Sequence, residues 1–405
     1  MKRRIFLKLT IAAPLILKLG CSQEEKQSLL LENIPKSFDF LEAKGSYREI
    51  GVQIGKKTGG TLKLILDERK EWFNKLMQIA DSSAGEKYAK ELLENSRNLF
   101  PQYVQEVEGM AVGAGVDFKI MWALTCKNEL SSFGNLDSGC STIFYKENAM
   151  TWLFHNEDGD VSYNNRLLVV KAITPSGVDF YSLSYPGIIS GIGPSINSQG
   201  ICQTTNFISC INPKAGIPRF IIGRAVLESR TMAEAVETIT TQPRAYPWHH
   251  NILSMGNSIF ASIETLPDGK IDVSYPENGI FVHTNHAIGR TTENYYYQNK
   301  DYIQTSSKPR LQSLQKLISN ANFPAGNPEK FIRFLSSHDG EPYSVCRHPL
   351  NIHQGEPVKG NDNKKEVRGQ TIASAFFDCS TKKMRIYKGN PCKAMMNENY
   401  NEYSF

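Results

Sequence analysis

The sequence predicts an α+β fold in layers, with helices first and strands afterwards. Residues 30–139 carry apolar side chains mostly at three- and four-residue spacing, which is typical of helices. After Gly139 the chain changes to short runs of β-branched and aromatic residues bounded by Gly, Pro, Asn and Ser. A few helical segments interrupt these runs. We therefore expect an α+β or layered α/β/β/α architecture with mostly antiparallel sheets.

The helical part divides into four segments. Periodic apolar residues predict a helix over 47–79, with an interruption at Gly59–Gly60. Further helices are expected over 87–99, ended by Pro101, and then over 103–112 and 121–130.

The second part is expected to hold strands with a few helices between them. A helix is expected over 219–239, with Thr231 as an internal cap, and further helices over 309–318 and 329–337. The last two strands should form a hairpin around Ser380–Thr381. The expected strands cover residues 141–145, 150–155, 167–172, 179–184, 202–208, 258–264, 270–275, 280–283, 371–378 and 383–387.

Composition and charge exclude several classes of protein. The 405 residues are 40% apolar and 21% charged, as in a globular protein with a sizeable core. The net charge of +5 comes from 46 basic and 41 acidic residues. Residues 1–20 hold five of the basic residues and no acid, so the remaining chain is neutral. No basic stripe interleaves with aromatic residues, and we therefore expect no nucleic-acid partner.

The N-terminus has the pattern of an export signal. Lys2, Arg3 and Arg4 precede a short apolar run, and residues 3–8 resemble a twin-arginine motif. Leu19-Gly20-Cys21 resembles the end of a lipoprotein signal, although Lys18 departs from it. We expect a signal peptide over 1–20, lipidation of Cys21 and a tether over 21–45. The protein would then be periplasmic or anchored to the membrane by a lipid. The alternative is a basic, disordered N-terminal arm.

The chain has eight cysteines, and no two of them form a CxxC pair or have zinc-ribbon spacing. We therefore predict no structural metal site. With Cys21 lipidated, seven cysteines remain, so at least one has no partner within the chain.

Gly139–Cys140 lies where a loop joins the first expected strand. Such a junction suits attack of the Cys140 thiol on the Gly139 carbonyl, which would release Cys140 as a new N-terminus. Its α-amine would have a pKa of roughly 7.7–8.0, near working pH, and could serve as the base for its own thiol. From the spacing alone, a buried structural cysteine is the better interpretation.

Further segments strengthen the nucleophile interpretation through a family resemblance. From about Ser46 to Pro391 the chain resembles the autoproteolytic acyltransferase/hydrolase family typified by acyl-CoA:isopenicillin N acyltransferase. These are N-terminal nucleophile hydrolases. The resemblance implies a four-layer αββα fold with a helical N-terminal segment. It rests on the segments 45–51, 108–116, 139–142, 156–158, 193–200, 283–286, 344–348, 371–374 and 388–392.

The resemblance also implies roles for single residues. Cys140 matches the processed nucleophile, and Asp158 would orient its α-amine and help bind the leaving group. Asn285 would donate to the oxyanion. Arg368 matches a basic position near the pocket, which His155 and Asn156 would flank. A helical fragment over 46–139 and a catalytic fragment over 140–405 would stay associated after cleavage.

The expected activity is that of an exported cysteine amidohydrolase. It would cleave linear amides, such as N-acyl amino acids or peptide-like amides, through an acyl-thioester on Cys140, with no cofactor. One alternative is an acyltransferase that moves the acyl group to an amine. The other is an inactive binding lipoprotein of the same fold.

Three other segments allow competing interpretations. Residues 156–160 could form an acidic turn or a calcium loop, although the spacing of an EF-hand is missing. His283 and His286 could bind a metal, but an oxyanion and packing segment is favoured. Residues 248–250 could line a pocket, and a solvent-exposed loop is favoured.

Overall fold

A computed structural model describes residues 37–130, 139–295, 298–321, 327–349 and 368–405. The predicted signal peptide, Cys21 and most of the predicted tether lie outside these residues. The described end of the tether is not a linker, because Asp39–Lys44 form strand β1 and pair with β4 (Leu168–Ile173). No helix in the described residues is long and apolar enough to cross a membrane.

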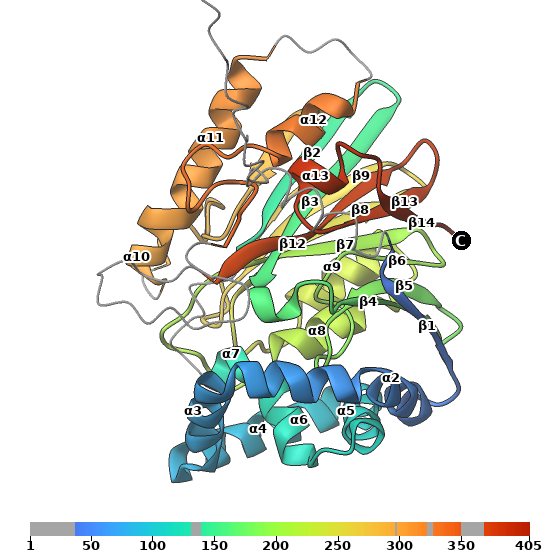
Figure 1. Cartoon of the computed structure of the whole chain (residues 1–405), viewed down its shortest axis with the longest axis vertical. Coiled ribbons are helices and arrows are strands. Elements are labelled where there is room, and N and C mark those ends of the chain that lie inside the picture. Colours follow the sequence, from blue (N-terminus) through green and yellow to red (C-terminus); the bar gives the residue numbers. More distant parts are fainter. Residues whose placement is uncertain (1–36, 131–138, 296–297, 322–326, 350–367) are drawn as a thin grey trace, which may run out of the picture. The chain divides into compact units, whose positions relative to one another are not determined.

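Helices α2 to α7 form the helical N-terminal segment that the sequence predicted (Figure 1). Ser46 caps α2, since its hydroxyl accepts from the Glu49 amide at 3.3 Å and the Glu49 carboxylate accepts from the Ser46 amide at 2.8 Å. The helices are α2 (Tyr47–Glu68), α3 (Lys70–Asp81), α4 (Ser83–Leu99), α5 (Pro101–Ala114), α6 (Phe118–Thr125) and α7 (Lys127–Leu130).

Helices α2 and α5 pack almost backbone to backbone. A Cβ on Gly51 would lie 2.0 Å from the Glu106 carbonyl oxygen, and one on Gly109 would lie 2.1 Å from that of Arg48. The expected interruption at Gly59–Gly60 is wrong because α2 runs on through both residues. Gly59 is instead required by the close approach of Ala114 on α5. The helix ends only at Glu68, and Arg69 follows it as the C-cap.

Replacing Gly51 with alanine should therefore destabilise the fold. The added methyl group must push α2 and α5 apart, and such overpacking typically lowers the free energy of unfolding by about 1–3 kcal/mol. Gly60→Ala is the matched control, because a Cβ there meets nothing within 4 Å. It should raise the free energy of unfolding by roughly 0.5–1 kcal/mol. Urea unfolding measures both variants, and equal effects would contradict this packing.

The remaining chain forms two large sheets. The eight-stranded sheet has the order β1-β4-β5-β6-β7-β8-β9-β10, and only the β1–β4 pair is parallel. Its other strands are β5 (Phe180–Ser184), β6 (Ser195–Asn197), β7 (Ile201–Phe207), β8 (Trp248–Ser254), β9 (Ile259–Thr265) and β10 (Ile271–Ser274).

The six-stranded sheet is antiparallel throughout and has the order β11-β2-β3-β12-β13-β14. The predicted closing hairpin is confirmed as β12–β13. The strands of this sheet are β2 (Ser141–Glu147), β3 (Met150–Asp160), β11 (Gly279–His283), β12 (Gly369–Asp378), β13 (Lys383–Lys388) and β14 (Tyr400–Tyr403).

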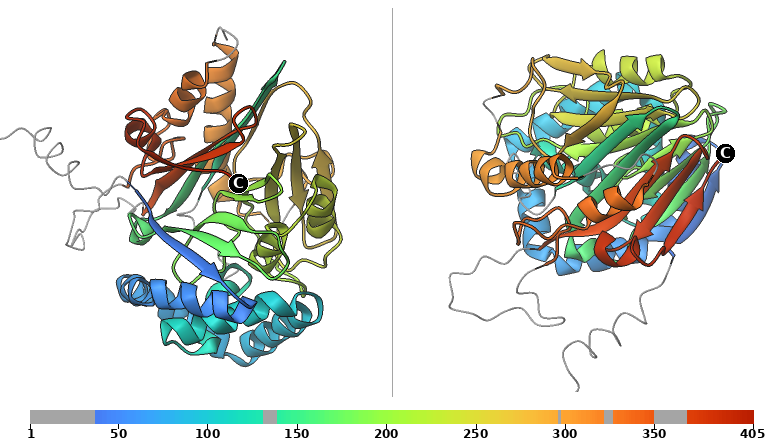
Figure 2. Two further views of the ribbon diagram at one scale, coloured as in Figure 1. Left: turned by 90° about the vertical axis from the view of Figure 1, so that its right-hand side faces the viewer. Right: turned by 90° about the horizontal axis from the view of Figure 1, so that it is seen from above.

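The two sheets pack face to face between layers of helices, which confirms the predicted αββα architecture (Figures 1 and 2). The stacked rings of Phe144 on β2 and Phe260 on β9, with centroids 4.2 Å apart, join the sheets. Adjacent residues of β8 face opposite sides, because Leu253 belongs to the main core whereas Ile252 packs in the cluster beneath α9. The outer helices include α8 (Arg219–Val226), α9 (Met232–Thr240), α10 (Lys300–Tyr302), α11 (Lys308–Ser319), α12 (Glu329–Leu335) and α13 (Pro391–Ala394).

Two expectations for the second part had different outcomes. Thr231 is confirmed as a cap, since its hydroxyl accepts from the Glu234 amide at 3.1 Å. It caps the start of α9, so the expected helix is divided into α8 and α9. The solvent-exposed loop expected at 248–250 is wrong. These residues begin β8, an interior strand, and all three are buried.

Candidate active site

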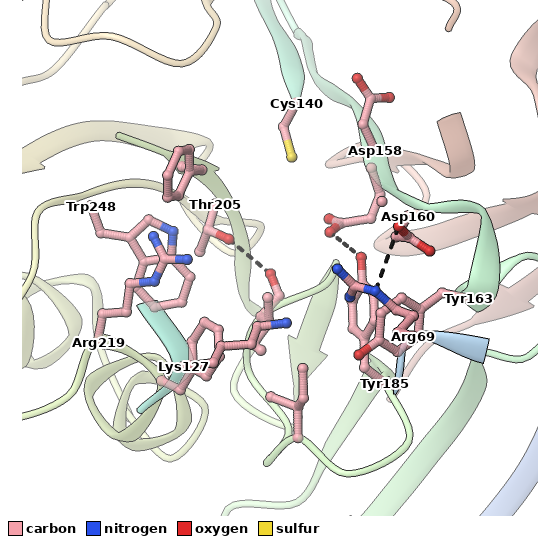
Figure 3. Close-up of a pocket in the computed structure, with 16 residues that line it drawn as sticks. Arg69, Lys127, Cys140, Asp158, Asp160, Tyr163, Tyr185, Thr205, Arg219 and Trp248 are labelled. Atoms are coloured by element: carbon pink, nitrogen blue, oxygen red, sulfur yellow. Dashed lines mark hydrogen bonds and ion pairs between the residues drawn. The ribbon is translucent and has the colours of Figure 1, made fainter. Parts of the chain in front are cut away.

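Cys140 lies immediately before β2, at a point where both sheets and the outer helices contribute side chains. Strand β2 pairs with β3 so that Ser141 is opposite Asn156, which brings Asp158 of β3 close to Cys140. The Cys140 thiol points into a cavity of about 90 Å³ (Figure 3). Only 6% of the residue is exposed. The predicted nucleophile therefore faces a protected space.

The backbone of Cys140 is fixed by two side chains from distant segments. Its amide donates to Asn285 Oδ1 at 2.7 Å. Arg310 of α11 donates from Nη1 to the Cys140 carbonyl at 2.8 Å and from Nη2 to Asn285 Oδ1 at 2.7 Å. The Asn285 Nδ2 group donates to the Phe207 carbonyl at 2.9 Å. In the uncut chain Asn285 thus accepts from Cys140, and its predicted oxyanion role stays a prediction.

Gly139 is closely surrounded by polar groups. A Cβ at this position would lie 2.8 Å from Arg347 Nη1 and 3.0 Å from both Arg310 Nη2 and the Tyr302 hydroxyl. Any larger residue would therefore displace the two guanidinium groups.

Asp158 is buried and only partly satisfied. Its Oδ1 accepts from the Thr371 hydroxyl at 2.7 Å, and its Oδ2 lies 3.8 Å from Arg347 Nη1. That Oδ2 has no hydrogen-bond partner in the part of the chain that the structure describes. Burial raises the pKa of Asp158 to about 6, although Arg347, Arg310 and Thr371 act in the opposite direction. The carboxylate thus keeps a free, buried acceptor beside the thiol.

Stability should depend on pH through Asp158. Its folded pKa exceeds the ordinary value of 3.8, so the folded state binds the proton more tightly than the unfolded state. The free energy of unfolding should therefore fall by about 3 kcal/mol as pH rises from about 4 to 6. Asp158→Asn in a Cys140→Ala background should remove this fall and raise the melting temperature at pH 7. Melting curves of the two uncut variants from pH 4 to 7 test this, and parallel curves would contradict it.

The cavity beside Cys140 combines charged and aromatic side chains. Most of its charges have partners: Asp160 accepts from Arg368 at 3.0 Å and lies 3.6 Å from Arg69 Nε, and Glu157 accepts from the Tyr185 hydroxyl. Its wall consists of Arg69, Lys127, Cys140, Glu157, Asp158, Gly159, Asp160, Tyr163, Tyr185, Ile188, Ile192, Thr205, Phe207, Arg219, Phe220 and Trp248.

Arg219 differs from the other cations of the cavity. Its guanidinium lies 4.9 to 5.2 Å from the centroids of four aromatic rings, including Phe207 and Trp248. The Nε and Nη1 atoms have no hydrogen-bond partner among the described residues. Glu129 accepts from the Arg219 backbone amide at 3.0 Å, and burial raises the pKa of Glu129. Burial lowers the pKa of Arg219. The cavity thus presents a buried cation whose Nε and Nη1 groups have no hydrogen-bond acceptor among the described residues.

Comparison with known proteins identifies the family. The model of the acyl-coenzyme A:6-aminopenicillanic acid acyltransferase family matches residues 145–393. The chain belongs to this family. It is therefore an enzyme of the N-terminal nucleophile hydrolase and acyltransferase class, which acts on amides.

Two curated relatives of this enzyme cover most of its length. The β-alanyl-dopamine/carcinine hydrolase of Drosophila melanogaster is 27% identical over a 379-residue alignment, which covers 87% of this chain and 92% of the relative. The 40 kDa form of the acyl-coenzyme A:6-aminopenicillanic-acid acyltransferase of Emericella nidulans is 24% identical over 311 residues, covering 76% and 80%. A solved structure of a conjugated bile acid hydrolase variant from Clostridium perfringens is 12% identical, with a TM-score of 0.39, and covers 66% and 97%.

The three predicted pocket residues of the enzyme do not line the cavity. His155 is buried, with Nδ1 2.9 Å from the Thr142 hydroxyl and Nε2 3.3 Å from Glu157. Asn156 donates to the Leu335 and Val345 carbonyls. Arg368 donates from Nε to Asp160 at 3.0 Å, and Asp160 lines the cavity. One ring nitrogen of His155 nevertheless lies within 4.8 Å of the Cys140 sulfur.

The competing interpretations of the sequence are resolved by the fold. Residues 156–160 belong to β3, so the acidic turn is wrong. His283 Nε2 lies 2.8 Å from Glu264, whereas His286 Nδ1 lies 2.7 Å from the Ser307 hydroxyl. Two groups of metal-binding side chains lie close enough together in the described residues to share an ion, Cys140 with His155 and Glu157, and a second group outside the cavity. His283 and His286 belong to neither group.

Sequence reasoning gave no role to four residues that surround the reacting groups. Arg310 and Tyr302 come from the helical segment after β11, Arg347 from a loop, and Arg219 from the start of α8. Arg347 lies within one of the motifs that carried the family resemblance, which was the only signal for any of them.

Proposed function

We propose that the enzyme cuts itself between Gly139 and Cys140 and then hydrolyses linear amides with the Cys140 thiol. The observation that carries this proposal is the fixed geometry of Cys140. Asn285 and Arg310 hold its amide and carbonyl at 2.7 and 2.8 Å, while the thiol faces the cavity.

Self-cleavage begins with attack of the Cys140 sulfur on the Gly139 carbonyl. The Gly139–Cys140 C–N bond breaks, the nitrogen takes the thiol proton, and a thioester forms between Gly139 and Cys140. Water hydrolyses the thioester, which leaves a carboxylate on Gly139 and a free thiol and α-amine on Cys140. The guanidinium groups beside Gly139 can stabilise the oxyanion of the attack, and Asp158 Oδ2 can accept from the new amine.

Amide hydrolysis repeats the same chemistry on a substrate. Burial, together with Glu157 and Asp158, raises the pKa of the Cys140 thiol well above its ordinary range. The thiol is therefore neutral at pH 7 and needs a base. The α-amine that cleavage creates supplies one, because its pKa is roughly 7.7–8.0. The thiol attacks the substrate carbonyl, the amine leaves with the proton, and water releases the acyl group as an acid.

Arg219 points to the substrate class. A buried guanidinium with unpaired donors favours a carboxylate, and the rings around it favour an apolar or aromatic neighbour. We therefore propose an amide that carries a carboxylate, such as an N-acyl amino acid or a peptide-like amide.

Water is the proposed acyl acceptor, for reasons of compartment. The twin-arginine-like start and Cys21 support export to the periplasm and anchoring by a lipid. Coenzyme A thioesters are cytoplasmic, so an exported enzyme would rarely meet them. The names of the two curated relatives include both a hydrolase and an acyltransferase, so transfer to an amine is the alternative.

Intact mass spectrometry of the purified protein tests the cleavage. We expect two chains that copurify, the second beginning at Cys140. With an N-acyl amino acid substrate, added hydroxylamine should yield a minor hydroxamate product beside the free acid. A single uncut chain that hydrolyses the substrate would overturn self-cleavage. A predominant hydroxamate at low acceptor concentration would favour the acyltransferase.

A further inference from the structure

Two histidines and two cysteines converge outside the cavity. His338 follows α12, Cys346 and His348 lie in the next loop, and Cys392 is in the first turn of α13. One donor atom from each lies within 4.8 Å of all the others. Cys346 is buried, His348 and Cys392 are half-buried, and His338 is exposed. These residues have no part in the chemistry proposed for Cys140.

Three distances in this cluster are close to those of a tetrahedral metal site, and the others are at most 4.8 Å. Zinc binds sulfur at about 2.3 Å and nitrogen at about 2.0–2.1 Å, so tetrahedral donors lie about 3.3 Å apart for two nitrogens and about 3.5 Å apart for nitrogen and sulfur. The His338 and His348 Nε2 atoms lie 3.1 Å apart. His348 Nε2 lies 3.5 Å from both the Cys346 and Cys392 sulfurs.

Hydrogen bonding does not account for these contacts. The His348 Nε2 atom contacts three other atoms that could bind a metal, yet an imidazole nitrogen carries at most one proton. It can therefore satisfy only one of them as a donor. A cation at the centre would instead give all four atoms a common partner.

We propose that His338, Cys346, His348 and Cys392 bind one zinc ion. Two thiolates and two imidazoles are the usual ligands of a structural zinc site, and soft thiolates disfavour magnesium and calcium. Four protein ligands leave no open position for substrate, so the ion would be structural. The absence of a CxxC pair led to the prediction of no metal site. The ligands come from three segments, which only the fold brings together.

This zinc site would fix the loop that presents Arg347 to the active site. Arg347 lies between two ligands, and its Nη1 is 3.8 Å from Asp158 Oδ2. Its backbone is also held, since its amide donates to the Thr371 hydroxyl at 3.0 Å and its carbonyl accepts from Asn390 at 2.6 Å. Ion binding at Cys346 and His348 would order both neighbours of Arg347. The zinc ion would thus act on Asp158 only through the position of Arg347.

Metal analysis of the full chain, purified under reducing conditions and incubated with zinc, tests the proposal. After removal of loosely bound metal we expect one zinc ion per chain in the wild type and in Cys140→Ala, since the site does not depend on cleavage. His338→Ala and Cys392→Ser should lose it, whereas Cys379→Ser, at a buried cysteine outside the cluster, should keep it. His338 is exposed, so its variant should fold. Cobalt in place of zinc should show the absorption of a tetrahedral thiolate site.

Several results would overturn this proposal without touching the proposed amidase activity. One is the absence of bound zinc in the reduced wild-type chain. Another is full retention of zinc by the His338→Ala/Cys392→Ser double variant. A third is a Cys346–Cys392 disulfide that persists in the purified protein and is found by peptide mapping, since it would remove both thiolates.

Discussion

Cys140→Ala is expected to abolish both self-cleavage and amide hydrolysis. The variant should run as one chain, because no other group can attack the Gly139 carbonyl to form the thioester. Its amidase activity should fall to background, a loss of at least about 10⁴-fold, as for other enzymes that lose their nucleophile. Gel electrophoresis, intact mass and product release from an N-acyl amino acid measure the two effects.

A matched variant distinguishes loss of the nucleophile from the structural effect of removing a buried cysteine. Cys379 is also 6% exposed and also buried against the core, but it lies at the turn after β12. Cys379→Ala should therefore stay cleaved and active. If Cys140→Ala were cut as completely as the wild type, attack by the Cys140 thiol would be the wrong mechanism.

Arg219→Met is expected to lower kcat/KM for carboxylate-bearing amides by about 10- to 100-fold. Methionine has a similar length and can still pack among the four rings, so the main change is loss of the cation. A hydrogen bond to a charged group contributes about 1.5–3 kcal/mol, which corresponds to this range. An N-acyl amine of the same acyl group that lacks the carboxylate should be hydrolysed as fast by the variant as by the wild type.

Lys127 provides the competing assignment for carboxylate binding. It lines the same cavity, and burial lowers its pKa to about 7, so it is only partly charged at neutral pH. Lys127→Met should have the smaller effect on the carboxylate substrate. A selective loss in Lys127→Met rather than in Arg219→Met would move the binding role to the lysine. If Arg219→Met lost as much activity on the amide without a carboxylate as on the amide with one, Arg219 would only support the cavity wall.

The overall architecture could be predicted because its signals are local. Helix periodicity before Gly139, strand-like runs after it and the cap at Thr231 each depend on residues close in sequence. Strand β8 could not be predicted in this way. Its first residues read as a polar loop, but His249 is satisfied inside the sandwich, 3.2 Å from Asn206 and 2.8 Å from the Ser262 hydroxyl. Those partners lie on β7 and β9, which only the sheet brings together.

The active site could be predicted only in part, for a related reason. Cys140 has a local signal in the glycine before it, and Asp158 and Asn285 stand in motifs that carried the family resemblance. Arg310 and Arg219 are single basic residues on helices, where a solvent-exposed position is the ordinary expectation. Their burial beside Cys140 follows from long-range packing of α11 and α8, which no short motif encodes.

Because self-cleavage depends on the contacts of Cys140, the extent of cleavage can be used to measure folding. The peptide bond to be cut is held by Asn285 and Arg310, which are synthesised long after Gly139. Strand β1 precedes this bond in the sequence and pairs with β4, which follows it. A chain that has not assembled both sheets cannot hold the bond in the geometry for attack. On the proposed mechanism, the fraction of cut chains therefore counts the molecules that have folded. An ordinary denaturing gel would then report the folding yield of every variant described above that keeps Cys140.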